Sequence, residues 1–147
     1  DELPPGTVIG TSSVRRAAQV LRRRPELVVR SIRGNADTRV AKLRDETQGF
    51  GAILLAYSGM ERLSMLDQVN EVLTAERMLP APGQGAVAVQ CRSDDTELLD
   101  MLRAIHHGPT AAEVGAERAF LGRLEAGCSA PVAALARYDG AAAEPTL

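Results

Sequence analysis

The chain has 147 residues, of which 45% are hydrophobic, so it can bury one ordinary core or two small ones without disulfides or metals. Its apolar runs are short, and the longest, near residues 52–57, is far below the roughly 20 residues that a membrane span needs. Two cysteines cannot make a disulfide framework, and free thiols suit a reducing compartment, so we expect a cytoplasmic protein with no membrane partner.

The charge is distributed unevenly along the chain. The formal net charge is −2, but residues 1–46 hold ten basic against six acidic groups, whereas residues 47–147 hold seven against thirteen. Sixteen of the seventeen cations are arginine, whose planar guanidinium offers the paired donors that match a carboxylate or a phosphate. The locally basic first third therefore indicates an anionic ligand.

Strand-like and helix-like segments alternate through the first half of the chain. β-prone runs at residues 7–10, 27–32 and 51–56 each precede a stretch with apolar residues at helical spacing. The periodic residues of these stretches are Val14, Ala17, Ala18 and Leu21; Ala36, Val40 and Leu43; and Met65, Leu66, Val69 and Leu73. Three consecutive strand-then-helix units predict an α/β domain with a parallel-rich sheet.

The segment at residues 78–85 interrupts this periodicity. Its prolines fix φ and its glycines permit turns that other residues resist, so we interpret it as a linker or hinge. Beyond it we expect a strand at residues 86–90, a helix that Asp94 or Asp95 caps, a helix from Pro109 to about Glu125, and a strand at residues 132–138. No partner follows the last strand, so we expect the chain to be truncated at this end.

Two of the strand-to-helix turns carry arginines. The first turn and the helix after it contain Thr11, Ser12, Ser13, Arg15 and Arg16. The second turn and the helix after it contain Arg33, Gly34 and Arg39. Ligands of open α/β sheets bind beyond the carboxyl ends of strands, and parallel connections place both turns at one edge. We expect the cations to converge on a ligand with several carboxylates or phosphates. The alternative for either turn alone is a helix cap, Ser12 or Ser13 at the first turn, beside solvated arginines.

Other candidate sites are weaker. The run Arg22, Arg23 and Arg24 lies at the far end of its helix without interleaved aromatics, so we interpret it as a solvated helix end and expect no nucleic-acid partner. His106 and His107 lack the paired spacing of a zinc site, so we expect no metal.

Cys128 is a candidate for covalent chemistry. It lies in a loop, residues 127–131, just after a predicted helix, where a thiolate would react and nearby arginines would lower its pKa. Cys91 ends an apolar strand-like run, so we expect it to be packed.

Four motifs, in this order, resemble successive signatures of the porphobilinogen deaminase (hydroxymethylbilane synthase) family. They are GTSSVRRAAQ at residues 10–19, RSIRGN at residues 30–35 with Thr38 and Arg39, PGQGA at residues 82–86, and RLEAGCSAP at residues 123–131. The resemblance spans nearly the whole chain, but it matches the middle and later-middle part of the family's sequence.

The resemblance implies a fold of hinged α/β domains similar to periplasmic binding proteins. Residues 1–78 would be most of the second domain, residues 79–107 would cross back to the first, and residues 108–147 would begin a small α+β third domain. It also implies a dipyrromethane cofactor, bound through a thioether to Cys128. Four porphobilinogens are added to this cofactor with loss of ammonia, which yields hydroxymethylbilane, and the full-length enzyme would be a monomer.

The resemblance also assigns roles residue by residue. Ser13, Arg15 and Arg16 would hold cofactor carboxylates with Thr11 beside them, and the backbone at Gln84 and Gly85 would line the hinge side of the cofactor site. Arg33 and Arg39, the candidate catalytic residues, and Arg62 would bind the substrate or the growing chain. The family's catalytic aspartate belongs upstream of Asp1, so we expect the full-length parent to be active and this chain alone to be inactive.

Two other functions stay open. A non-enzymatic binding module of periplasmic-receptor type, which captures a small anion, explains the arginines at the two turns equally well but gives Cys128 no task. A structural fragment without a retained function is the third possibility.

Overall fold

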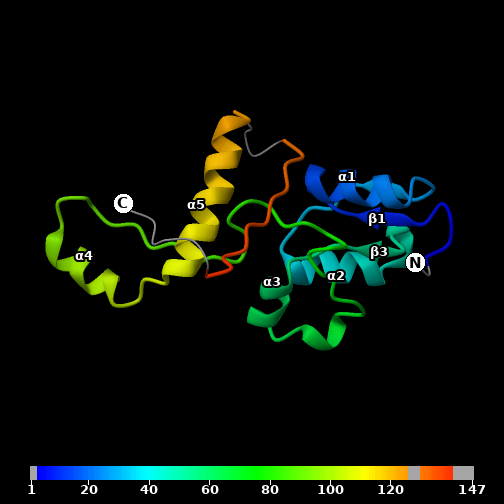
Figure 1. Ribbon diagram of the computed structural model, residues 1–147. Coiled ribbons are helices and arrows are strands. Elements are labelled where there is room, and N and C mark those ends of the chain that lie inside the picture. The colour runs from blue at the N-terminus through cyan, green and yellow to red at the C-terminus, as the bar shows by residue number, and fades with distance from the viewer. Residues whose placement is uncertain (1–2, 126–129, 141–147) are drawn as a thin grey trace. The chain divides into compact units, whose positions relative to one another are not determined.

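The computed structural model describes residues 3–125 and 130–140 (Figure 1). These residues divide into two compact units, one built mainly from residues 3–78 and the other from residues 79–125 and 132–140. Within the part of the chain so described, no helix has both the length and the apolar character that crossing a membrane requires.

The first unit is built on a three-stranded parallel sheet. Strands β1 (Val8–Gly10), β2 (Val28–Arg30) and β3 (Ala52–Ile53) lie in the order β2-β1-β3. Val8 is opposite Val28, and Ile9 is opposite both Val29 and Ala52. The parallel sheet and the helices between its strands confirm the predicted α/β class.

Gly10 permits the close approach of the segments around β1. A Cβ atom at this position would lie 2.9 Å from Cγ2 of Ile53, 3.1 Å from Cδ1 of Phe50 and 3.2 Å from Cγ2 of Ile32. A larger residue would therefore push these side chains away from the centre of the sheet.

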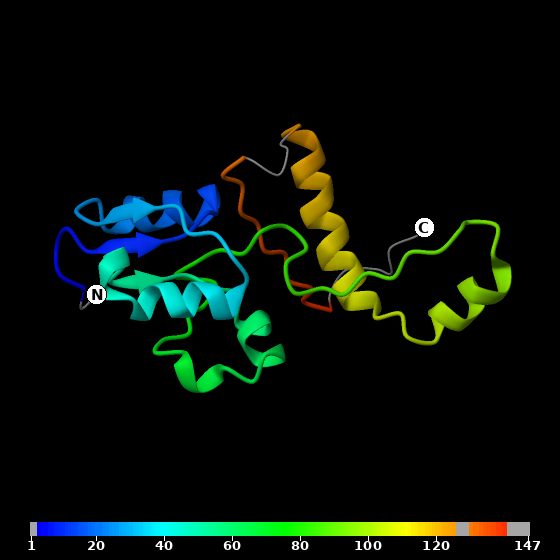
Figure 2. The same ribbon diagram turned by 180° about the vertical axis from the view of Figure 1, so that it is seen from behind.

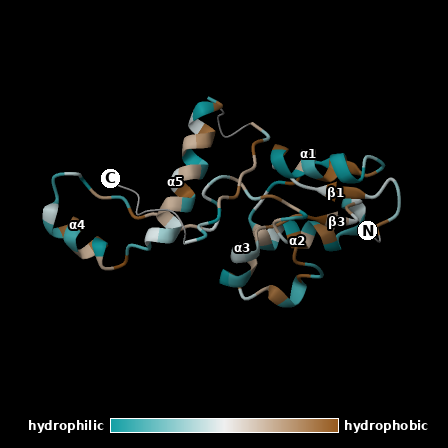
Figure 3. Cartoon of the chain, in the orientation of Figure 1, coloured by the Kyte–Doolittle hydropathy of each residue, from teal (hydrophilic) through white to brown (hydrophobic). Residues whose placement is uncertain are grey.

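One helix lies on each side of the strands. Helix α1 (Val14–Arg23) contacts β2, and helix α2 (Ala36–Arg44) contacts β3 (Figures 1 and 2). β3 is hydrophobic along its length, whereas α1 carries both kinds of residue, as expected for a helix with one face on a sheet (Figure 3). The buried hydrophobic side chains of the unit are Ile9, Leu27, Ile32, Val40 and Met60.

The third helical segment differs from the prediction. Helix α3 (Tyr57–Arg62) follows β3, and a 3-10 turn, η2 (Leu66–Gln68), replaces the helix expected around Met65, Leu66, Val69 and Leu73. The prediction of one longer helix is wrong because Ser64 has a φ of 53°, in the left-handed region that a continuing α-helix excludes.

The second unit contains helices α4 (Thr96–Arg103) and α5 (Gly108–Arg123). Oδ1 of Asp95 accepts a hydrogen bond from the N–H of Leu98 at 3.1 Å, which confirms the predicted cap of α4. Pro109 occupies the first turn of α5, where its missing N–H costs nothing, and this confirms the predicted start of that helix.

The two strands predicted in the second unit are not formed. Residues 86–90 and 132–138 are not in strand conformation, and within residues 3–125 and 130–140 the paired strands are β1, β2 and β3 alone. A β-strand needs a neighbouring strand for its hydrogen bonds, and neither segment has one in the described part of the chain. Residues 132–138 instead donate backbone hydrogen bonds to carboxylates of α5 and to the carbonyl of Pro80.

Candidate functional site

The turn after β1 is held by its own hydroxyl groups. Thr11 is buried, its N–H donates to the carbonyl of Arg30 at 3.1 Å, and its Oγ1 accepts from the N–H of Ser13 at 3.2 Å. Ser13 caps α1 by accepting a hydrogen bond from the N–H of Arg16 at 3.4 Å. Thr11 and Ser13 therefore fix where α1 begins and where its first arginines stand.

The turns after β1 and β2 lie side by side, as predicted. Oγ of Ser12 donates to the carbonyl of Ile32 at 2.6 Å and lies 3.0 Å from Oγ of Ser31. The sequence indicates Ser12 as a possible helix cap, and this link between the two turns could not be predicted from that role. The run of three hydroxyl residues before α1 is a signal for such a link, because one cap leaves the other hydroxyls available.

Arg15 and Arg16 are held close to the sheet. Nη1 of Arg16 donates to the carbonyl of Leu54 at 3.0 Å, just beyond the end of β3, and Arg15 is only 7% exposed. Burial lowers the pKa of both guanidinium groups from the ordinary arginine value. Taking a cation out of water disfavours its charged form, and this is the cause for Arg15 and the largest cause for Arg16.

The positive charge of Arg39, which follows the second turn, acts on Arg16. After burial, the positive charges of Arg15 and Arg39 are the next causes that lower the pKa of Arg16. Nε of Arg39 donates to the carbonyl of Gly34 at 2.6 Å, so its side chain folds back onto the turn before α2. The positive charges of Arg15 and Arg39 thus act on Arg16, and a carboxylate or phosphate bound near these cations would offset their repulsion.

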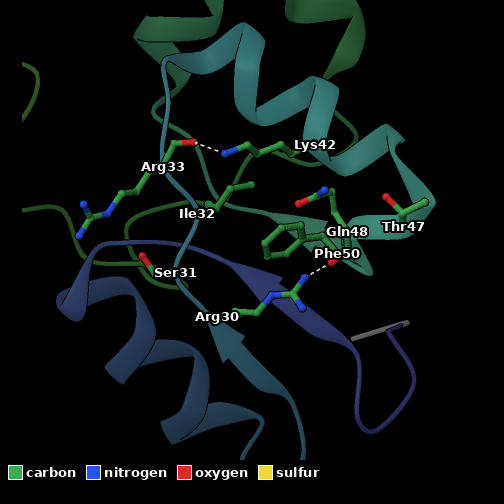
Figure 4. Close-up of a pocket in the computed structure, with 8 residues that line it drawn as sticks. All are labelled: Arg30, Ser31, Ile32, Arg33, Lys42, Thr47, Gln48 and Phe50. Carbon is green, nitrogen blue, oxygen red and sulfur yellow. Dashed lines mark hydrogen bonds between the residues drawn. The ribbon is translucent and has the colours of Figure 1, made fainter.

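Arg33 and Arg62 have different surroundings. Arg33 is exposed, and its carbonyl accepts from Nζ of Lys42 at 3.0 Å, while its guanidinium points away from Lys42 and Phe50 (Figure 4). Arg62 is exposed at the end of α3. Both keep their assignment to the substrate as predictions.

Gly34, between Arg33 and α2, is required by geometry. Its φ is 120°, and a Cβ atom there would lie 2.7 Å from Cγ2 of Thr38. An L-residue at this position would be strained and would also collide with the first turn of α2.

A polar hollow lies beside the second turn, and sequence reasoning assigned no role to most of its lining. It has a volume of about 290 Å³, and none of its eight described lining residues is acidic (Figure 4). The guanidinium carbon of Arg30 lies 4.1 Å from the centroid of the Phe50 ring, and Arg30 also donates to the carbonyl of Gln48. The lining residues are Arg30, Ser31, Ile32, Arg33, Lys42, Thr47, Gln48 and Phe50.

The predicted hinge residues belong to the second unit. Oε1 of Gln84 accepts from the N–H of Ala81 at 3.3 Å, and Gly83 and Gly85 have φ values of 72° and 98°. Gln84 and Gly85 line a second hollow, of about 210 Å³, that α5 also borders. Glu117 of α5 is buried beside this hollow, and sequence reasoning gave it no role.

The remaining candidates are placed as follows. Cys128 lies outside the described residues, and Cys91 is half-buried. His107 caps α5 through its Nδ1 atom, which accepts from the N–H of Thr110. Among residues 3–125 and 130–140, no group of three or more histidine, cysteine or acidic side chains is arranged to hold a metal ion.

The basic run at the end of α1 is only partly a solvated helix end. Arg22 and Arg23 are exposed, but Arg23 donates to the carbonyl of Glu76. Arg24 is half-buried, donates to the carbonyl of Leu3 at 2.7 Å and pairs with Glu26. These contacts connect α1 to other parts of the first unit.

Comparison with known proteins settles the family. Residues 1–100 match the family described as porphobilinogen deaminase, dipyromethane cofactor binding domain, and residues 111–144 match the porphobilinogen deaminase C-terminal domain. The chain belongs to the porphobilinogen deaminase family. The first match contains both arginine turns and the 82–86 segment, and the second contains Cys128, so the resemblance drawn from the four motifs is confirmed.

Curated relatives named porphobilinogen deaminase are similar over nearly all of the chain. The protein from Listeria innocua is 50% identical over 143 residues, which are 95% of this chain and 46% of the relative. The protein from Desulforudis audaxviator is 49% identical over 95% of this chain and 45% of its own length, and that from Halalkalibacterium halodurans is 49% identical over 92% and 43%. The chain thus spans less than half the length of the porphobilinogen deaminases that it matches.

Proposed function

We propose that this chain is part of an enzyme that joins four porphobilinogen units into hydroxymethylbilane on a dipyrromethane bound to Cys128. The observation that carries the proposal is that the two arginine-bearing strand-to-helix turns lie side by side, joined by the hydrogen bond from Ser12 to Ile32, in a chain of this family. Each pyrrole of the cofactor and of the product carries an acetate and a propionate, so the bound chain is a polycarboxylate.

The donor set fits this group. Guanidinium groups bind carboxylates through paired N–H donors, and three cations held together are unfavourable until an anion lies among them. When bound, the dipyrromethane supplies the pyrrole to which the first substrate is joined. Arg15 and Arg16 hold its carboxylates, and Thr11 and Ser13 fix the helix start from which these arginines project.

Substrate binding is assigned to Arg33, Arg39 and Arg62. Arg39 lies on α2, which follows the turn that Ser12 joins to the Arg15 and Arg16 turn, so a carboxylate that Arg39 binds would stand near the cofactor carboxylates. This proximity orients the substrate pyrrole relative to the bound chain, and orientation is a large part of catalysis when two reactants must be joined.

The proposed reaction also needs a carboxylate that transfers protons. In the family this is a catalytic aspartate, and none of the acidic residues of this sequence matches it. We therefore assign turnover to a full-length protein of the length that the relatives have, and we expect this chain alone to be inactive.

The finer architecture belongs to the same proposal. It comprises hinged domains like those of periplasmic binding proteins, with residues 1–78 in the second domain, 79–107 returning to the first and 108–147 beginning the third. Gln84 and Gly85 line the hinge side, the full-length enzyme is a monomer, and it acts in the cytoplasm.

Intact mass and Ehrlich's reagent, applied to full-length protein containing this chain, test the proposal. The expected result is a mass increase of two pyrrole units that locates to Cys128, together with consumption of porphobilinogen. A protein that carries no pyrrole but binds small carboxylates would instead be a non-enzymatic anion-binding module, since the same arginines serve either function.

A further inference from the structure

Glu117 is a buried carboxylate in the middle of α5. It is 7% exposed, its Oε1 accepts a hydrogen bond from the N–H of Ala136 at 2.8 Å, and its Oε2 accepts one from the N–H of Gly83 at 2.5 Å. Burying a carboxylate is costly unless hydrogen bonds compensate, and those to an ionised acceptor are the stronger kind. Both oxygens of Glu117 are used in this way.

The two bonds bring together three segments that are far apart in the sequence. The turn at residues 82–85 packs on α5, since a Cβ at Gly83 would lie 3.9 Å from Cγ1 of Val114. Residues 132–138 reach the same helix, because the N–H of Tyr138 donates to Oε1 of Glu113 at 2.9 Å. The N–H of Ala134 donates to the carbonyl of Pro80 at 3.2 Å, which joins the two outer segments directly.

A carboxylate suits this position better than its neutral analogue. Glutamine has one side-chain oxygen and an amide NH₂, so at position 117 it can accept one of the two backbone N–H groups and must present a donor to the other. A buried donor facing a donor is unfavourable, so one of the two bonds would be lost. The ionised carboxylate of Glu117 can thus accept both backbone N–H groups, one from Gly83 and one from Ala136.

We propose that Glu117 is a positioning residue of the proposed reaction. Its carboxylate fixes the turn with Gln84 and Gly85 and residues 134–138 on α5, the helix that ends at Arg123, five residues before Cys128. The inference rests on the proposed function for its link to turnover, whereas the anchoring of the two segments stands on the contacts alone.

The test uses full-length protein containing this chain, with the variants Glu117→Gln, Glu113→Gln and Glu97→Gln. Hydrogen exchange of the Gly83, Ala136 and Tyr138 amides, the mass of the bound pyrroles, and kcat and KM for porphobilinogen are measured. Glu113→Gln removes the same charge one turn earlier on α5, beside Tyr138. Glu97→Gln removes it at an exposed position of α4.

In Glu117→Gln we expect the amide of Gly83 or Ala136 to exchange roughly ten- to hundredfold faster, as for the loss of one hydrogen bond to a charged group. We expect kcat to fall about tenfold with KM changed by less than about twofold, because the substrate arginines lie on other elements. Glu113→Gln should leave Gly83 and Ala136 protected, and it should keep the Tyr138 amide bonded, because one side-chain oxygen is enough to accept one N–H. Glu97→Gln should match the unsubstituted protein in all measurements.

Wild-type exchange at both amides together with wild-type kcat in Glu117→Gln would overturn the inference. If Glu117→Gln does not fold, Glu117→Asp replaces it, because aspartate keeps the charge but cannot reach both segments; fast exchange at Gly83 or Ala136 then supports the anchor and slow exchange at both contradicts it. Absence of bound pyrrole in the unsubstituted protein would instead refute the proposed function, and the exchange rates would still decide the anchor.

Discussion

The hydroxyl of Ser12 donates a hydrogen bond to the carbonyl of Ile32 at 2.6 Å, and this bond joins the two turns from which the arginines of the candidate site extend. Ile32 is almost fully buried, so the bond connects the site directly to the core of the first unit. A residue without charge, Ser12, therefore holds together the two turns that carry the arginines.

Replacing Ser12 by alanine should separate the two turns. We expect Ser12→Ala to lower the free energy of unfolding by about 1 kcal/mol, the usual contribution of one such hydrogen bond, and to reduce the fraction of protein that carries pyrroles. Urea unfolding and intact mass of full-length protein measure the two effects. An unchanged free energy of unfolding together with an unchanged pyrrole-loaded fraction would show that the Ser12 hydrogen bond does not position the two turns.

Arg16→Ala should hinder cofactor assembly. The substitution removes a cation from the convergent set and leaves the Leu54 carbonyl without the Arg16 donor, so we expect the pyrrole-loaded fraction to fall roughly tenfold or more. Arg22→Ala, at an exposed position of the same helix, is the matched control and should load normally. Full loading of the Arg16→Ala protein would count against the assignment.

Cys128→Ser should abolish covalent attachment. A serine hydroxyl is a far poorer nucleophile than a thiolate near neutral pH, so we expect the mass of the two pyrrole units to be lost. Cys91→Ser, measured in parallel, should keep the added mass because Cys91 is assigned to packing. Attachment that survives in Cys128→Ser and disappears in Cys91→Ser would reverse the two roles.

Gly10→Ala should destabilise the first unit. The added methyl would lie 2.9 Å from Cγ2 of Ile53 in a closely packed region, so we expect a loss of about 1–3 kcal/mol in the free energy of unfolding. Gly59→Ala in α3 provides the contrast, because an added Cβ there has no atom within 4 Å and alanine favours a helix. Equal stabilities of the two variants would contradict the packing argument.

Asp45, between α2 and the 3-10 turn η1 (Glu46–Gln48), should contribute a pH dependence at acidic pH. The hydroxyl of Thr47, followed by its backbone N–H, lowers the pKa of Asp45 below the ordinary carboxyl value. The resulting stabilisation is present above the ordinary pKa and is lost as the pH falls through the lowered one. In an NMR titration, Thr47→Ala should raise the pKa of Asp45, and an unchanged pKa would contradict this cause.

The elements that could be predicted from the sequence are those that local signals specify. Ser13 and Asp95 cap α1 and α4, Pro109 begins α5, and the β-then-α pattern gave the parallel sheet. Residues 86–90 and 132–138 have strand-like composition, but a strand also needs a neighbour, and composition cannot show whether one is present.

The candidate site was predictable to a similar extent. Placing two arginine turns at one sheet edge follows from parallel connections, so the proximity of Arg16 and Arg39 could be expected. The contacts of Glu117 could not be predicted, because they join residues 19 and 34 positions apart in the sequence. The contact of the Arg30 guanidinium with the Phe50 ring could not be predicted either, because no local repeat indicates it. Such contacts depend on tertiary packing, to which helical and strand periodicity are insensitive.

The bond from Nη1 of Arg16 to the carbonyl of Leu54 has a consequence for affinity. An arginine on an open surface samples many rotamers and loses that freedom when it captures an anion. Here the bond of Nη1 already restrains the guanidinium, whose fork carries five N–H donors in all, so less side-chain entropy is lost when a carboxylate binds.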